Sequence, residues 1–163
     1  MVIINFNFKS EYKNENKYDL KLFLRALVTS LCRSCLDSNG KKFDINLFLK
    51  RFPGLKEFIY KNELNFEIQI LKAVQRMDYK LKHIPGFICV LFEIFYTEGI
   101  VSEETFWKWK DDDPTQDGHI ISVFLLKEFF ELLSELNKHL EKNVFFNFIT
   151  NCNNFFYCFC YFN

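Results

Sequence analysis

The cysteines are the first residues of this sequence whose spacing could support chemistry. Cys32 and Cys35 are separated by two residues, as in zinc knuckles and redox-active dithiols. A structural zinc site needs four ligands, and the other close pair, Cys158 and Cys160, lies far along the chain. We therefore predict no metal site, and we expect all six cysteines to be reduced thiols in the cytosol.

Histidine and carboxylate chemistry is also weakly supported. His83, His119 and His139 are scattered, with no serine or cysteine nearby in a nucleophile arrangement, and we expect them at the surface or at helix ends. Glu103 and Glu104 are paired carboxylates, but adjacent residues of a helix point about 100° apart and cannot act on one substrate. No glycine-rich phosphate loop is present. We therefore expect neither an enzyme nor a bound cofactor.

The stretch from Leu91 to Trp109 instead has the charge and aromatic content of an interaction surface. The helix that enters it carries Glu93 as its only charge, so other helices must cover that helix on nearly all sides. Ser102 is suited to the N-cap of the next helix, and the glutamate pair follows in the first turn, where the helix dipole favours anions. Phe106 and Trp109 then share a face, while Trp107 points toward the two glutamates.

The elements that must position these residues are helices. Apolar residues recur every three or four positions over 19–37, 65–82 and 121–142, and Pro85 starts the apolar helix. Asp44 is predicted to cap a short helix that Pro53 and Gly54 end before another begins at Leu55. Residues 110–118 are predicted to form an exposed loop. Without a strand pattern, the fold class is all-α, a HEAT-like stack of antiparallel helix pairs.

Charge divides the chain into two halves. Residues 1–82 carry 16 basic against 9 acidic side chains, and residues 83–163 carry 5 against 12. An alternative function is therefore RNA contact through basic residues of the first half, although no aromatic side chains are interleaved with them and the pI is about 6.8. This basic set comprises Lys41, Lys42, Lys50, Arg51, Lys80 and Lys82.

The two ends of the sequence differ from its middle. Residues 1–17 form a ragged N-terminal segment without a helical period or a signal peptide, so we expect a cytoplasmic protein. Residues 144–163 contain 7 Phe, 5 Asn and 3 Cys, a bias typical of AT-rich codons, and they are too polar for a membrane span. This tail is either a disordered or artefactual end or a loosely docked apolar arm. We predict one domain over 18–142, with 143–163 outside it.

Several segments together resemble the W-two domain that closes translation initiation factors. Residues 92–96 with 100–106 and Trp109 are similar to its first acidic and aromatic box, here called the first box. Residues 23–32 resemble a helix of the initiation factor four gamma members, including their short homologue. Residues 111–114 and 122–133 are similar to segments farther along that domain. The resemblance covers about residues 20–136 and implies the HEAT-like fold.

The resemblance also implies a function and a site. In the family, the boxes bind lysine-rich segments of other initiation factors, and in the four gamma members they recruit the MAP-kinase-interacting kinase. The partner-binding residues carried over to this sequence are Glu93, Tyr96, Glu98, Glu103, Glu104, Phe106, Trp109, Glu128 and Glu131. For the three aromatic residues, the alternative is a purely structural place in the core.

The second box, residues 128–139, departs from the family pattern. Glu128 to Glu131 matches it, but Leu132 stands where the family has tryptophan. Residues 137–139 replace a run of acidic residues. These changes remove negative charge from the place where lysines of a partner would dock.

Overall fold

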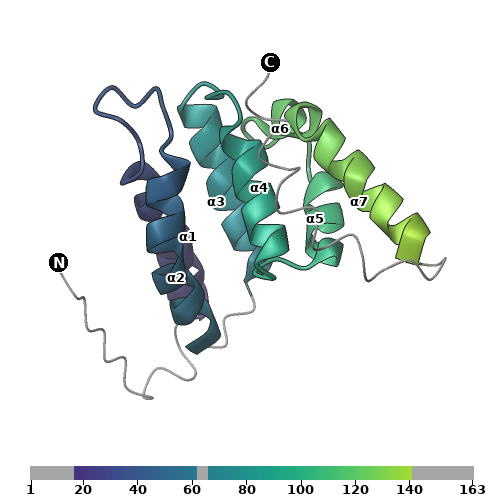
Figure 1. Cartoon of the computed structure of the whole chain (residues 1–163), viewed down its shortest axis with the longest axis horizontal. Coiled ribbons are helices and arrows are strands. Elements are labelled where there is room, and N and C mark those ends of the chain that lie inside the picture. The colour runs from purple at the N-terminus through teal and green to yellow at the C-terminus, as the bar shows by residue number, and fades with distance from the viewer. Residues whose placement is uncertain (1–16, 62–65, 141–163) are drawn as a thin grey trace.

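The computed structural model describes residues 17–61 and 66–140, and these ranges contain seven α-helices. Within these ranges no strand is present, so the predicted all-α class is confirmed. Successive helices stack side by side, with α1 and α2 forming one antiparallel pair and α3 and α4 the next (Figure 1). The helices are α1 (Lys17–Arg33), α2 (Ile45–Lys61), α3 (Glu67–Lys80), α4 (Phe87–Thr97), α5 (Glu103–Lys110), α6 (His119–Leu125) and α7 (Lys127–Leu140). Of the ragged segment predicted at 1–17, residues 1–16 lie outside the described residues, and α1 begins at Lys17. The tail predicted at 143–163 also lies outside the described residues.

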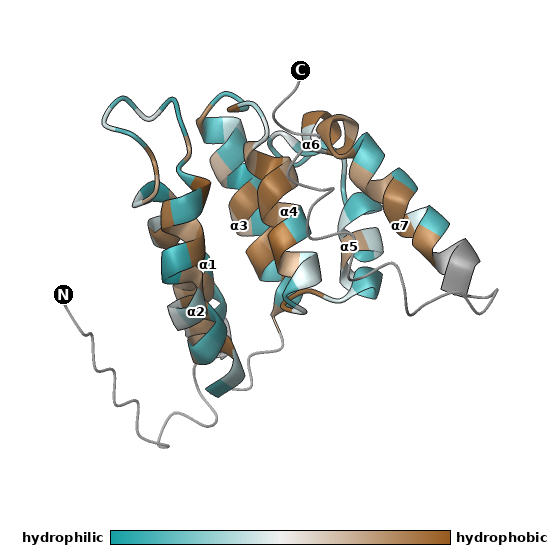
Figure 2. Cartoon of the chain, viewed as in Figure 1, coloured by the Kyte–Doolittle hydropathy of each residue, from teal (hydrophilic) through white to brown (hydrophobic). Residues whose placement is uncertain are grey.

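Helix α4 lies at the centre of the stack and is strongly apolar (Figure 2). Six of its eleven residues are buried, which confirms the expectation that other helices cover it. Its Phe95 packs against Phe48 and Phe52 of α2, with ring centres 6.5 and 6.0 Å away. Its Phe92 faces the other way, toward α5 and α7. One helix therefore joins two aromatic cores.

The start of α2 agrees with prediction, but its middle does not. The Leu47 N–H donates to Asp44 Oδ1 at 2.9 Å, so the predicted cap is present. The predicted break at Pro53 and Gly54 is wrong, because α2 runs through both residues. Pro53 is exposed, and buried apolar residues precede and follow it at helical spacing. Their burial offsets the hydrogen bond that the proline cannot donate.

The segment after residue 118 also differs from prediction, since it forms two helices instead of one. The helix is interrupted at Leu126, which is fully buried between α6 and α7. The face of α6 is inverted relative to its sequence pattern: His119 and Ser122 point inward. Ile121 and Phe124, which were expected on the buried face, are 46% and 76% exposed.

The cysteines, histidines and basic residues considered for chemistry differ in burial. Cys32 and Cys35 are buried free thiols, and burial raises the pKa of the Cys32 thiol, with Cys35 adding to the effect. His119 begins α6, as expected for a helix end, but it is buried, while His83 lies 2.7 Å from Asp78 Oδ2. The six basic residues proposed for RNA contact are all exposed, and Arg51 donates to the Ser34 carbonyl.

Candidate functional site

Four aromatic rings from three helices meet beside the acidic turn between α4 and α5. Phe106 of α5 lies 5.4 Å from Phe92 and 6.0 Å from Tyr96, measured between ring centres. Phe129 of α7 lies 5.1 Å from Phe106 and 6.3 Å from Tyr96. The first box and the second box are therefore in direct contact through these rings. Tyr96 is the one of the four that keeps part of its side chain exposed.

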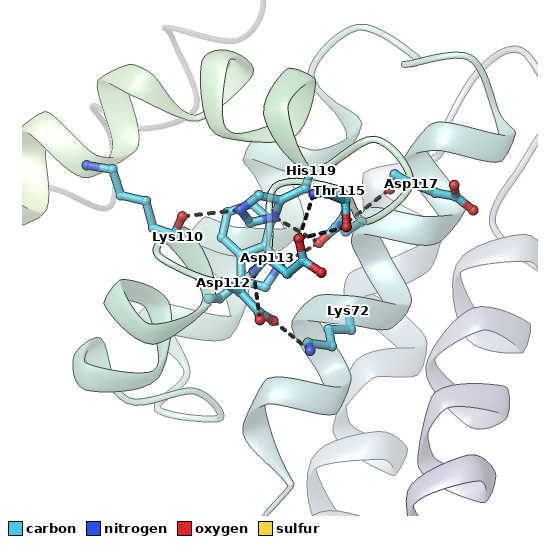
Figure 3. A network of polar contacts seen from close by, with 9 residues as sticks. Lys72, Lys110, Asp112, Asp113, Thr115, Asp117 and His119 are labelled. Atoms are coloured by element: carbon cyan, nitrogen blue, oxygen red, sulfur yellow. Dashed lines mark hydrogen bonds and ion pairs between the residues drawn. The ribbon is translucent and has the colours of Figure 1, made fainter.

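A second layer is organised around Trp109, which has no exposed surface. Its indole N–H donates to Gln75 Oε1 at 2.8 Å, and Gln75 Nε2 donates to the Asp117 carbonyl at 3.0 Å. His119 lies edge-on to Trp109 at 4.9 Å, and its Nε2 is 3.2 Å from the Lys110 carbonyl, so this nitrogen carries the proton (Figure 3). This network fixes the loop between α5 and α6 against α3.

The same loop is held from outside by an ion pair. Lys72 Nζ of α3 lies 2.6 Å from Asp112 Oδ2 (Figure 3). Next to it, Asp113 accepts hydrogen bonds from the amide and hydroxyl of Thr115. The hydrogen bond from Lys72 and the bond from the Asp113 amide hold the pKa of Asp112 below its usual value. The carboxylates of Asp112 and Asp113 thus hold the loop in place.

The start of α5 is anchored to α3 through Glu67. Its Oε2 accepts hydrogen bonds from the Ser102 amide at 2.8 Å, the Ser102 hydroxyl at 2.6 Å and the Thr105 hydroxyl at 2.7 Å. Ser102 occupies the predicted N-cap position, but its hydroxyl does not cap the helix because it bonds to Glu67. Partial burial would raise the pKa of Glu67, yet the hydrogen bonds from Ser102 and Thr105 outweigh it and the pKa is lowered.

The predicted carboxylates of the first box differ in how they are engaged. Glu103 Oε1 accepts the Trp107 indole N–H at 2.9 Å, which confirms the predicted orientation of Trp107. Glu104 pairs with Lys108 at 2.7 Å, and Glu98 pairs with Lys56 of α2 at 2.7 Å. Both of these ion pairs are exposed.

The second box places its carboxylates on the exposed face of α7. Glu128 and Glu131 are both exposed, and Glu131 lies 3.7 Å from Lys127. Phe129, which lies between them in the sequence, is inserted against Tyr96 and Phe106 of the first box. Glu93 lies on α4, half-buried, one turn before Tyr96.

The comparisons with known proteins identify the domain formed by the later helices. Residues 66–143, which take in α3 to α7 with both boxes, match the family model described as W2: eIF4-gamma/eIF5/eIF2-epsilon. Residues 66–143 form a W-two domain. None of the helices in the described ranges is long and apolar enough to cross a membrane.

The relatives extend the likeness beyond the W-two domain. Eukaryotic translation initiation factor 4 gamma 3 from Homo sapiens is 30% identical over 125 residues, 74% of this chain and 8% of the relative. The Mus musculus factor of the same name is 27% identical over 142 residues, 85% of this chain and 9% of the relative. Mus musculus eukaryotic translation initiation factor 4 gamma 1 is 25% identical over 125 residues, 75% and 8% of the two chains. This chain thus spans less than a tenth of each relative, and no solved structure matches it significantly.

Within the W-two domain, the predicted site residues fall into two groups. The acidic residues and Tyr96 retain exposed area, whereas Phe106 and Trp109 have none and support the surface from below. Sequence reasoning missed Glu67 and Gln75, which hold α5 in place. Leu71, Gln75 and Asp78 follow one another at core spacing, so Gln75 could have been found as a polar residue on a buried face. Glu67 lies 35 residues from Ser102 and had no such signal.

Glu67 should make the W-two domain sensitive to acid. Its folded-state pKa lies below the usual 4.5, so its stabilising effect is complete above about pH 4.5 and is lost as pH falls through the lower value. Glu67→Gln is expected to cost about 1 kcal/mol at pH 7, allowing for partial solvent screening. Urea unfolding at pH 7 and pH 3 should show the difference shrinking in acid. An equal cost at both pH values would contradict the role of the charge.

Proposed function

We propose that this chain is a non-catalytic, cytoplasmic protein-binding scaffold of translation initiation, and that its acidic boxes bind lysine-rich segments of a partner. Support comes from the contact between the two boxes through Phe129, which brings together α4, α5 and α7, the helices that carry or flank the predicted carboxylates. Other initiation factors and the MAP-kinase-interacting kinase are the partner classes that the family resemblance implies. The second half of the sequence carries 12 acidic against 5 basic side chains, which favours a basic partner.

The exposed ion pairs of the first box provide a binding chemistry for lysine. Glu98 and Glu104 already hold lysine ammonium groups at 2.7 Å, at exposed positions where exchange costs little. A partner lysine can replace Lys56 or Lys108 with the same geometry. Tyr96 is partly exposed near Glu103, and burial together with the charge of Glu103 raises the pKa of the Tyr96 hydroxyl. The phenol therefore stays protonated and can donate to a partner.

The proposal is tested by neutralising exposed carboxylates of the two boxes. Glu98→Gln, Glu104→Gln and Glu128→Gln together should weaken binding of a lysine-rich peptide by about tenfold at low salt, since each charge contributes up to about 1 kcal/mol. The loss should shrink as salt is raised, because exposed charges are screened over about 8 Å at physiological ionic strength. Isothermal titration at two salt concentrations measures both effects.

A matched control distinguishes an effect of the boxes from an effect of the net charge on peptide binding. Glu57→Gln, Asp111→Asn and Asp117→Asn change the charge equally at exposed positions outside the boxes. This variant should bind the peptide nearly as well as the unmodified chain. If both triple variants lose affinity equally, the peptide senses only overall charge, and the boxes are not the partner site.

A further inference from the structure

A groove lies between α5, α6 and α7, on the flank of α5 opposite the cluster around Phe129. Its volume is about 420 Å³. We propose that it binds an acidic amphipathic segment of a partner, with an apolar side chain in the groove and a carboxylate at its rim. This goes beyond the proposed function, since the ligand has the opposite charge. The lining residues are Trp107, Lys110, Val123, Phe124, Lys127, Phe130, Glu131 and Ser134.

Adjacent phenylalanines of α7 separate the groove from the first box. Phe129 packs on Tyr96 and Phe106, whereas Phe130 packs on Trp107 at 5.2 Å and stacks parallel to Trp109 at 6.3 Å. Phe130 is 3% exposed and forms part of the groove floor. The two surfaces therefore rest on different phenylalanines, and Glu131 is the predicted partner-binding residue that also lines the groove.

The apolar side of the groove continues onto α6, whose side chains are inverted. This helix buries His119 and Ser122, and its other residues are apolar, as the brown ribbon in Figure 2 shows. Phe124 at the groove and Ile120 beyond it are 76% and 67% exposed, and Ile121 and Leu125 are 46% and 40% exposed. Neighbouring exposed apolar side chains of this kind mark an interaction surface. An apolar ligand group would remove these side chains from water.

The charge at the rim specifies the polar part of that ligand. Lys110 Nζ lies 4.8 Å from the Trp107 ring centre and 4.9 Å from that of Phe130. Among the described residues, no carboxylate forms an ion pair with it, while Lys127 and Glu131 are 3.7 Å apart. The groove is thus lined by two positively charged side chains, Lys110 and Lys127, and one negatively charged side chain, Glu131. A carboxylate beside the apolar side chain would pair with Lys110, and residues three or four apart on a helix meet this requirement.

The test uses two designed helical peptides that share leucine and phenylalanine at positions i and i+4. One carries glutamate beside them and the other carries lysine. The full chain should bind the glutamate peptide more tightly. Phe124→Ser should weaken this binding by about tenfold, and Lys110→Gln by about threefold. Leu22→Ser is the matched control, because Leu22 is a similarly exposed apolar residue on α1 (62%) and its loss should leave binding unchanged.

Binding of the lysine-rich peptide distinguishes this site from the proposed function. Phe124→Ser should leave that binding unchanged, and the triple glutamine variant should leave binding of the glutamate peptide undiminished. The proposal is overturned if the lysine peptide binds the groove equally well, or if Leu22→Ser matches Phe124→Ser. It is also overturned if sedimentation shows that the chain is a dimer and that Phe124→Ser dissociates this dimer. It is likewise overturned if the chain's own tail occupies the groove, which would be seen as protease cleavage after residue 143 that is faster in Phe124→Ser than in the unmodified chain.

Discussion

Replacing Trp109 with alanine is expected to lower the free energy of unfolding by about 3–5 kcal/mol. The indole has no exposed surface and contacts Phe92 at 4.8 Å and His119 at 4.9 Å between ring centres. Its removal would leave a cavity between α3, α4, α5 and α7. It would also take the donor from Gln75 Oε1, and an unsatisfied buried acceptor adds to the cost.

The measurement is urea unfolding followed by circular dichroism, with Trp107→Ala as the control. Trp107 lies two residues away on the same helix, but it is half-buried and its indole bonds to Glu103 near the surface. Its replacement should cost about 1–2 kcal/mol, since less apolar area leaves water. Equal losses for the two variants would show that the layer around Trp109 does not hold the helices together.

Local signals were sufficient to predict much of this fold. The apolar period over 65–82 corresponds to α3, and Asp44 caps α2 as its type and position suggested. The apolar content of α4 predicted its central place correctly, because a helix without a polar face can be stable only when others surround it. In each case, residues within about one turn of each other carry the information.

The wrong predictions arose where tertiary packing overrides local preference. Pro53 and Gly54 are strong helix breakers, yet Phe52 and Leu55 are buried on either side of them and the helix continues. The apolar residues from 121 onward suggested one continuous helix. The helix is instead interrupted at Leu126, and the side chain of Phe124 on α6 is exposed. No local pattern distinguishes an apolar residue that packs in the core from one that is exposed at the surface.

The candidate site was predictable as far as it is contiguous in sequence. The first box gave the position of α5, its first-turn glutamates and the orientation of Trp107. The groove was not predicted, because it is assembled from three helices and depends on the break at Leu126. Glu67 was missed for a similar reason: its carboxylate acts on a turn 35 residues away, and only the fold brings them together.

Phe129→Ala is expected to cost about 3–5 kcal/mol and to separate the two boxes. Phe129 is 6% exposed, and its ring lies within 6.3 Å of Phe92, Tyr96 and Phe106, measured between ring centres. It is the residue of the second box that inserts among Phe92, Tyr96 and Phe106 of the first. Removing it leaves a cavity between α4, α5 and α7, so α7 should lose its fixed position beside α5.

Leu132 on the same helix provides the control for this prediction. It is 39% exposed, and Leu132→Ala should cost less than about 1 kcal/mol because little apolar area is lost from the core. A double-mutant cycle with Phe106→Ala, measured by urea unfolding, should give a coupling of about 0.5–3 kcal/mol between Phe106 and Phe129. Additive losses would mean that the rings stabilise the fold independently, and the boxes would then be neighbours without forming one unit.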